Sequence, residues 1–136
     1  MNVLRTRSAR RAVDRLDRQA RRRYDSAVEE LRGRGCAAGG YRLLGDTGEN
    51  YPLCCRYFYG QWRMHLVFPD ADTIVIVSVA QHTADSNPHE ALAEVFPGLS
   101  ATGRRRSAKP PCCEDSVQPP QMSDEARAIL DDVFGL

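Results

Sequence analysis

RYFYGQWRMHLVFPDADTIVIVSVAQH, residues 56–82, is the stretch that decides the fold of this chain. It contains three runs rich in aromatic and β-branched residues, separated by two short groups of turn formers, a pattern typical of an antiparallel meander. Gly60-Gln61 predicts a two-residue hairpin turn with glycine at its first central position, and Pro69 to Asp72 predicts a second turn. We therefore expect strands near residues 53–59, 62–68 and 73–80.

The two turns also predict which side chains share a face of the sheet, because side chains alternate along a strand. Pairing Tyr59 with Trp62 and Phe68 with Thr73 leaves one face without any charge, which we expect to be core. That face carries Tyr57, Tyr59, Trp62, Met64, Leu66, Phe68, Val75, Val77 and Val79. The other face is a candidate working surface and carries Arg56, Phe58, Arg63, His65, Val67, Ile74, Ile76, Ser78 and His82.

The residues before the meander predict helix. Between residues 8 and 32, apolar side chains recur at three- and four-residue spacing with arginine on the opposite side, which indicates an amphipathic helix. One long helix and a helical hairpin bent near Asp17 both satisfy the pattern, and the glycines of residues 33–40 end it. Residues 2–5 predict a short edge strand, and residues 41–44 a short strand that leads into the meander.

The residues after the meander predict two more helices and a linker. Asn87 and Pro88 are suited to the cap and first position of a helix that runs to about Phe96. Residues 99–122 are rich in proline and poor in apolar side chains, which predicts a mobile linker. Ser123 then caps an acidic amphipathic helix over residues 123–136. The chain is thus expected to be an α+β protein with a main domain (1–98), a linker (99–122) and a C-terminal helix (123–136).

Composition and cysteine usage restrict the class of protein. A chain of 136 residues with 42% apolar residues is expected to form one compact domain. It has no apolar run that could cross a bilayer and no secretory signal, so the cytoplasm is the expected location. Five cysteines, an odd number, predict reduced thiols rather than a disulfide framework. The two adjacent pairs lack the CxxC spacing of zinc sites, and we expect no metal and no cofactor.

Charge is distributed unevenly along the chain. Residues 1–34 hold eleven arginines against five acidic residues, whereas residues 114–136 hold six acidic residues and one arginine. A basic start and an acidic end indicate either a polyanionic partner or pairing of the two ends within the molecule. The arginines of the helical segment, Arg11, Arg15, Arg18 and Arg22 among them, are candidate contacts for nucleic-acid phosphates. The acidic C-terminal helix is a candidate to dock on this basic surface.

The order of elements and several short motifs resemble the RelE/ParE toxin superfamily. The likeness spans residues 8–97 and rests on Gly40-Tyr41-Arg42-Leu43, Arg56, Gly60, Trp62-Arg63, and the strand end VSVAQH at residues 77–82. It implies a small α+β fold with a helix or helical hairpin packed on one side of a three- to four-stranded antiparallel sheet. RelE-like members cut mRNA, often on the ribosome, and are inhibited by a cognate antitoxin. ParE-like members act on DNA gyrase and lack the ribonuclease site.

The same resemblance implies candidate site residues. Arg56 and Arg63 fall where the ribonucleases keep basic residues on the sheet, His82 where a basic residue follows the last strand, and His89 near a C-terminal catalytic position. The chain departs from the pattern because its sheet has no lysine. Cleavage of RNA without a metal needs a base for the 2′-OH, a cation for the phosphoryl oxygens and an acid for the 5′-oxygen. Arg63, Arg56, His65, His82 and His89 supply these group types.

Two function classes therefore remain open for the chain. The first is a RelE-like, metal-independent endoribonuclease that acts on mRNA or the ribosome and binds an antitoxin protein. The second is a non-enzymatic protein of the same fold, which would bind a partner protein such as gyrase, or DNA, through its arginine-rich helix. Loss of RNA cleavage in a histidine variant would distinguish the first from the second.

Overall fold

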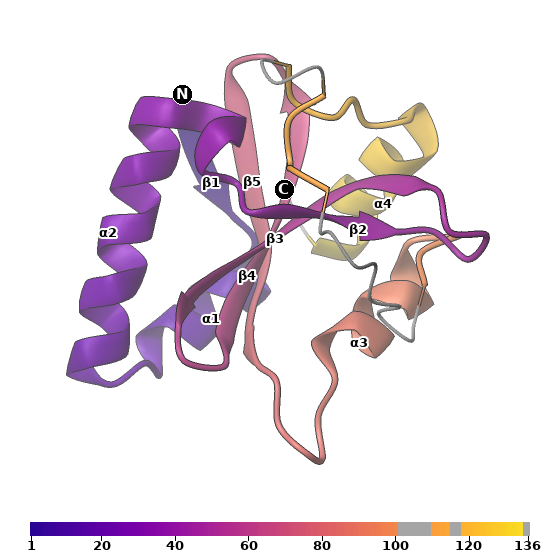
Figure 1. The fold of residues 1–136 in the computed structure, drawn as a ribbon. Helices are drawn as coiled ribbons and strands as arrows, with labels where there is room; N and C mark the ends of the chain where they lie inside the picture. The colour runs from indigo at the N-terminus through magenta and orange to yellow at the C-terminus, as the bar shows by residue number, and fades with distance from the viewer. Residues whose placement is uncertain (101–109, 115–117, 135–136) are drawn as a thin grey trace.

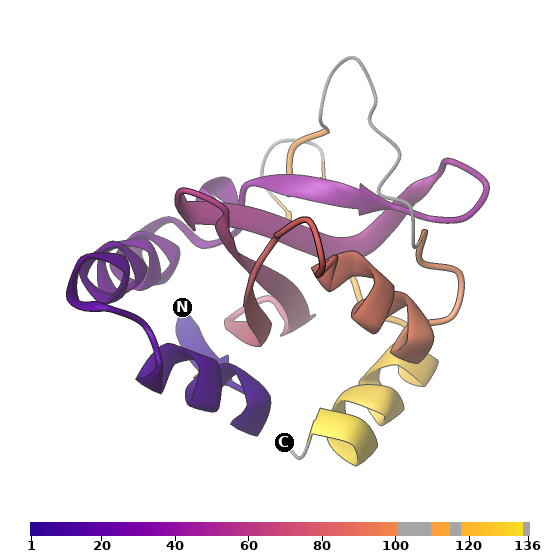
Figure 2. The same ribbon diagram turned by 90° about the horizontal axis from the view of Figure 1, so that it is seen from below.

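The computed structural model of the chain describes residues 1–100, 110–114 and 118–134. In this part, one five-stranded sheet has the order β1-β5-β4-β3-β2, with helices on both of its faces (Figures 1 and 2). The elements are β1 (Asn2–Arg5), α1 (Arg7–Asp14), α2 (Arg18–Arg34), the 3-10 helix η1 (Gly35–Ala38), β2 (Tyr41–Leu44), β3 (Asn50–Tyr59), β4 (Trp62–Asp70), β5 (Thr73–Gln81), α3 (Pro88–Val95) and α4 (Asp124–Phe134).

The sheet differs in two respects from the one expected. It has five strands because both predicted short strands, residues 2–5 and 41–44, join the meander. It is mixed because β1 pairs with β5 in parallel, whereas all the other pairs are antiparallel. The α+β composition is as expected, but helices cover both faces of the sheet, not one.

The N-terminal helical segment is a hairpin. Thr6 caps α1, since its Oγ1 accepts a hydrogen bond from the N–H of Ala9 at 3.1 Å. The same hydroxyl donates to the carbonyl of Val77 at 2.9 Å, which ties the start of α1 to β5. Asp17 caps α2 by accepting from the N–H of Ala20 at 2.8 Å. The alternative with a bend near Asp17 is therefore confirmed.

The meander has the expected strands, but its register is not the one expected. Gly60 has a φ of 53° and so takes the positive φ of a primed hairpin turn, and Tyr59 pairs with Trp62 as predicted. One residue further, Tyr57 and not Phe58 lies opposite Arg63, so Phe58 is an extra residue on β3. Extra residues of this kind also shift the pairing of β4 with β5. A shift by one residue moves a side chain to the other face.

The physical cause of the first shift is aromatic packing. Phe58 turns toward α2, where its ring lies 5.8 Å from that of Tyr24 and 6.4 Å from that of Trp62, centroid to centroid. Two buried clusters result, one on each face of the sheet. The first joins α1 and α2 to Cys54, Met64, Leu66, Phe68, Ile74, Ile76 and Val79. The second joins α3 and α4 to Leu43, Leu53, Cys55, Val67, Val75 and Val77.

The face of the sheet that we expected to be a solvent-exposed candidate site is therefore not present in the predicted form. Its predicted members divide between the two clusters, and the face that carries Arg63 and His65 is largely covered by α3 and α4 (Figure 2). An apolar surface made of valines cannot remain in water without cost, and the two C-terminal helices bury it. Arg63, His65 and Ser78 lie at the end of this face next to the Gly60 turn.

The two C-terminal helices begin where the sequence predicts. The side chain of Asn87 accepts a hydrogen bond from the N–H of His89 at 3.0 Å, and Ser123 Oγ accepts from the N–H of Ala126 at 3.1 Å. In α4, Ala126 and Leu130 are buried in the second cluster. The acidic helix thus docks within the molecule, but on the sheet face opposite the arginine-rich helices, so the expected pairing with those helices is wrong (Figure 2).

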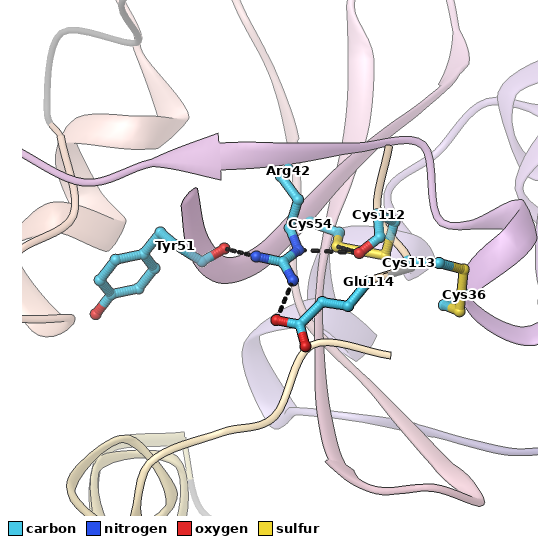
Figure 3. Close-up of polar contacts among 7 residues, drawn as sticks. All are labelled: Cys36, Arg42, Tyr51, Cys54, Cys112, Cys113 and Glu114. Carbon is cyan, nitrogen blue, oxygen red and sulfur yellow. Dashed lines mark hydrogen bonds and ion pairs between the residues drawn. A yellow bond between two sulfur atoms is a disulfide. The ribbon is translucent and has the colours of Figure 1, made fainter. Parts of the chain in front are cut away.

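Part of the predicted linker is fastened to the sheet. Residues 110–114, which we call the strap, lie along the outer edge of β2, where the N–H of Arg42 donates to the carbonyl of Pro110 at 2.8 Å. Two disulfides, Cys36–Cys113 and Cys54–Cys112, hold it there (Figure 3). The predictions of reduced thiols and of mobility at these residues are therefore wrong. Residues 101–109, 115–117 and 135–136 of the predicted linker and helix lie outside the described residues.

Gly40, directly before β2, is a glycine that we expect no other residue to replace without loss of stability. Gly40 has a φ of 78°, and a Cβ there would collide with the backbone of Cys55. We expect Gly40→Ala to lower the free energy of unfolding by at least about 1 kcal/mol, because it combines strain with overpacking.

The matched control is Gly33→Ala, where a Cβ meets nothing within 4 Å. In a helix, that change should raise stability by up to about 1 kcal/mol. Urea unfolding measures both, and equal effects of the two changes would contradict the prediction.

Candidate functional site

Three basic side chains from two elements meet at the end of the sheet next to the Gly60 turn. Arg63 and His65 lie two residues apart on β4 and so point to the same face. His89, in the first turn of α3, packs against them, with its ring edge-to-face on that of His65 at a centroid distance of 5.2 Å. All three side chains are buried. The structure therefore brings together three of the five residues that the sequence proposes as catalytic.

Arg63 is held in place by two neighbours. Its Nη2 donates to Oε1 of Gln61 at 3.2 Å, and its guanidinium carbon lies 4.2 Å from the ring centroid of Tyr57, a cation–π arrangement. Tyr57 is 41% exposed whereas Arg63 is 3% exposed. The phenol ring thus forms a cover between the guanidinium and solvent.

The three buried side chains keep unused hydrogen-bonding capacity. Nε of Arg63, Nε2 of His65 and Nδ1 of His89 are buried without a hydrogen-bond partner in the described part of the chain. The other ring nitrogen of His65 does have a partner, because Nδ1 lies 2.7 Å from Oγ of Ser78. Buried polar groups are nearly always paired, so three such atoms at one place indicate a site that accepts a polar ligand.

Burial determines the charge of the two histidines. Desolvation is the largest cause that lowers the pKa of His89, and together with the nearby Arg63 and His82 it brings the pKa to about 4. Desolvation also lowers the pKa of His65 well below its usual value, with His89 and Arg63 adding to the effect. Both imidazoles are therefore neutral at neutral pH, and Arg63 is the one permanent cation among the three side chains.

His82 lies at the border of this cluster. It follows β5, its N–H donates to the carbonyl of Gln61 at 3.1 Å, and its side chain is half-buried. Its influence on the pKa of His89 places it near that ring. His82 is thus the most accessible of the histidines that the sequence proposes.

Arg56 is not part of the cluster. It lies opposite Met64 and on the α2 face, where Nη1 donates to the carbonyl of Ala38 at 2.7 Å and Nη2 to Glu30 at 3.0 Å. The predicted placement of Arg56 beside His65 is wrong, because the extra residue Phe58 shifts the register between β3 and β4. In the structure, Cys55 lies opposite His65.

The arginines proposed as phosphate contacts form a separate surface. Arg11, Arg15, Arg18 and Arg22 lie on α1, α2 and the turn between them, and all are exposed. None of them forms an ion pair within the described residues, whereas Arg21 pairs with Asp25. This surface lies on the side of the sheet away from α3, and hence away from His89 (Figure 1).

Two neighbours of the cluster were not proposed from the sequence. The expected register pairs Tyr57 with Met64 and so predicts a core position for Tyr57, and it predicts no particular role for Ser78. The signal for Ser78 is its position as the one polar residue within the run IVIVSVA, residues 74–80. A lone hydroxyl in an apolar strand needs a hydrogen-bond partner, and His65 supplies it.

The described residues contain no group of three or more histidine, cysteine or acidic side chains that could hold a metal ion. Among their helices, none is both long and apolar enough to cross a membrane.

The neutral histidines predict a pH dependence of stability. The unfolded chain takes up protons at these residues below pH ~6.5, whereas the folded chain resists protonation until the pKa of His89 at about 4. Stability is therefore full above pH ~6.5 and falls as the pH is lowered, by up to about 1.4 kcal/mol per pH unit for each histidine. Urea unfolding at pH ~7 and pH ~5.5 measures the decrease.

Matched variants assign this decrease to particular residues. We expect His89→Gln to remove about half of the decrease, since one of the two buried histidines is then absent. His82→Gln is the control and should retain most of the decrease, because desolvation and not His82 is the largest cause of the low pKa of His89. Equal slopes for the wild type and His89→Gln would contradict the assignment.

Comparison with known proteins gives one structural likeness. No protein-family model matches the chain, and no curated protein matches it. Among solved structures, the chain is similar to the YoeB dimer from Staphylococcus aureus, with 14% sequence identity, a TM-score of 0.47, and coverage of 61% of this chain and 98% of that one. These values leave the family of the chain open.

Proposed function

We propose that this protein is a metal-independent endoribonuclease that cleaves mRNA in the manner of RelE-like toxins. The observation that carries the proposal is the convergence of Arg63, His65 and His89, each with a buried polar atom that lacks a partner. A phosphodiester suits this cluster, because its oxygens accept a hydrogen bond from Nε of Arg63 and its negative charge complements the guanidinium. The motif order from Gly40 to His82 supports the same proposal.

Each group of the cluster has a role in this chemistry. His89 is neutral at neutral pH and accepts the proton of the ribose 2′-OH as that oxygen attacks the adjacent phosphorus. Arg63 stabilises the charge that develops on the phosphoryl oxygens. His82, at the accessible border, donates a proton to the 5′-oxygen as its bond to phosphorus breaks. His65 is a positioning residue, because it is fully buried and packs edge-to-face on His89.

The low pKa of His89 is compatible with the role of a base once RNA is bound. A base with a pKa of about 4 is weak in the empty site. A phosphate group placed beside the ring favours the imidazolium form, since opposite charges stabilise each other in a buried site. Binding of the anionic substrate therefore raises the pKa of His89 toward the working pH.

Access to Arg63 requires movement of one side chain. Tyr57 lies over the guanidinium and is 41% exposed, so a rotation of its side chain uncovers Arg63 without a change in the backbone. Rotation of a partly exposed side chain is fast compared with enzymatic turnover. The uncovered phenol is then free to stack on a neighbouring base.

The test is cleavage of a 5′-labelled mRNA by the purified protein, first in EDTA without ribosomes and then with ribosomes in a buffer that contains Mg²⁺. We expect cleavage by the wild type and a loss of roughly 10²–10⁴-fold in rate for His82→Ala, the usual contribution of a general acid. Induced expression should arrest growth for the wild type and not for the variant. RNA that stays intact with the wild type under both conditions, with normal growth, would overturn the proposal.

A second candidate function rests on the arginine-rich helices. Arg11, Arg15, Arg18 and Arg22 are exposed without ion pairs in the described part of the chain, and so can bind phosphates or an acidic protein. In this alternative the protein is a non-enzymatic binding module, as in ParE-like members that act on gyrase, or a DNA-binding protein. Intact RNA combined with steeply salt-dependent binding to duplex DNA would favour it. An antitoxin partner and a cytoplasmic location belong to the first proposal.

A further inference from the structure

The strap joins three parts of the molecule that are distant in sequence. Its adjacent cysteines bond to different elements: Cys113 to Cys36 in η1, and Cys112 to Cys54 in β3 (Figure 3). The sequence separations are 77 and 58 residues. In this arrangement the strap closes the outer edge of β2, which in its absence is an unpaired edge of the sheet.

Polar contacts of the strap depend on the same placement. Arg42, on β2, is 5% exposed, and its guanidinium donates to the carbonyl of Cys112 at 2.9 Å and to Glu114 at 2.7 Å. A third bond reaches the carbonyl of Tyr51 at 3.3 Å. Two of the three partners of this buried cation therefore belong to the strap. If the strap leaves, the guanidinium loses them and must turn toward solvent.

We propose that the strap is a thiol–disulfide exchange site, which a dithiol reductant opens in two ordered steps. Cys36 and Cys113 are 8% and 9% exposed, whereas Cys54 and Cys112 are 0% and 1% exposed. Exchange requires direct attack of a thiolate on sulfur, so the more accessible bridge reacts first. Reduction of Cys36–Cys113 loosens one end of the strap and gives access to Cys54–Cys112.

Each step is an ordinary exchange reaction. A thiolate of the reductant attacks one sulfur of the bridge, forms a mixed disulfide, and releases the other cysteine as a thiolate. The second thiol of the reductant then attacks the mixed disulfide. The reductant ends as a disulfide, having given two electrons, and the two protein thiolates take up two protons. After both steps no disulfide joins the strap to η1 or β3, and its hydrogen bonds, the Arg42–Glu114 ion pair and the packing of Cys112 and Cys113 remain.

Two aromatic rings, those of Tyr41 and Tyr57, connect the edge of β2 to the candidate site, so that release of the strap affects the site. Tyr41, which follows Gly40 on β2, lies edge-to-face on Tyr57 at a centroid distance of 5.9 Å, and Tyr57 covers Arg63. Release of the β2 edge therefore loosens the cover of the guanidinium. This consequence for RNA cleavage rests on the proposed function, whereas the ordered opening of the strap does not.

The test counts thiols before and during reduction by dithiothreitol. Without reductant, denatured protein should be alkylated at Cys55 alone, and with excess reductant at all five cysteines. During a titration of the native protein, mass spectrometry should find Cys36 and Cys113 alkylated before Cys54 and Cys112. Five reactive cysteines without reductant would overturn the inference, and so would the reverse order or simultaneous reaction of the two bridges.

Hydrogen exchange tests whether the strap then leaves. The N–H of Arg42 donates to Pro110 and that of Cys112 to Gly40. After full reduction both should exchange on the order of tenfold faster, the factor of one ordinary hydrogen bond, while amides between β4 and β5 remain unchanged. Unchanged exchange at Arg42 would overturn the inference. Equally faster exchange at all amides of the sheet would also overturn the inference, because the disulfides would then stabilise the whole fold and not the strap in particular.

A double variant separates the two bridges without a reductant. In Cys36→Ser/Cys113→Ser the inner bridge remains, so the Arg42 amide should stay as protected as in the oxidised wild type. Addition of dithiothreitol to this variant should release the strap in a single step. Fast exchange at Arg42 before reduction would contradict the assigned order. None of these measurements depends on RNA cleavage.

Discussion

We expect Arg63→Ala to lower the rate of RNA cleavage by roughly 10²–10³-fold, the usual effect of removing one preorganised donor to a developing negative charge. Arg63 is the permanent cation of the buried cluster, and its Nε has no partner there. Arg63→Lys retains the charge but loses the planar fork that contacts two phosphoryl oxygens, so it should restore only part of the rate. Single-turnover cleavage of labelled RNA measures both variants.

Arg56→Ala is the matched control for this prediction. Arg56 lies on the neighbouring strand, but on the opposite face of the sheet and bonded to Glu30 and Ala38. Its loss should change the cleavage rate little, although both arginines resemble site residues in the sequence. Urea unfolding of each variant separates an effect on stability from one on cleavage. Equal losses of rate for Arg56→Ala and Arg63→Ala would refute the assignment of the site to one face.

The second large effect is expected on stability at Arg42. Arg42→Met preserves much of the side-chain volume but removes the donors to the carbonyls of Cys112 and Tyr51 and to Glu114. Each buried acceptor left without a partner costs about 1–3 kcal/mol. We therefore expect the free energy of unfolding to fall by about 3–5 kcal/mol, measured by urea unfolding of the oxidised protein.

Glu114→Gln tests whether the charge of this ion pair matters by itself. The side chain of Glu114 is 51% exposed, whereas that of Arg42 is 5% exposed. A half-exposed partner contributes little, so this change should cost less than about 1 kcal/mol. If Glu114→Gln destabilised the protein as much as Arg42→Met, the ion pair and not the buried carbonyls would hold the strap.

Much of the local structure could be predicted because its signals are local. The spacing of apolar residues between residues 8 and 32 is sufficient to predict helix, even without the capping residues Thr6 and Asp17. Asn87-Pro88 and Ser123 mark the starts of α3 and α4, and Gly60 marks the hairpin. Each of these signals acts within a few residues of the position it determines.

Register could not be predicted with the same success, because it depends on packing between elements. Phe58 becomes an extra residue on β3 because its ring packs on Tyr24 of α2. Nothing within the strand itself reveals this, and a shift of one residue exchanges the faces of its neighbours. Arg56 was consequently placed beside His65, and Tyr57 was placed in the core.

The cysteines illustrate the same limit. Five cysteines whose spacing matches no known disulfide framework are consistent with reduced thiols. Two adjacent cysteines also cannot easily form disulfides with the same element. In the fold they bond to two different elements, because the strap passes between η1 and β3. Such a pairing depends on the distance between Cα atoms in the fold, 5.3 and 5.6 Å here, which no spacing in the sequence reports.

By itself, the sequence determined the type and order of the elements, because apolar periodicity, caps and turn residues act over short distances. It also indicated Arg63, Arg56, His65, His82 and His89 as candidate site residues. Only the tertiary structure decided that Arg63, His65 and His89 meet in a buried cluster, that Arg56 lies on the other face, and that the strap closes the edge of β2. These outcomes depend on contacts between segments that are far apart in the chain. Such contacts form only when the helices and the sheet pack together into a close-packed core.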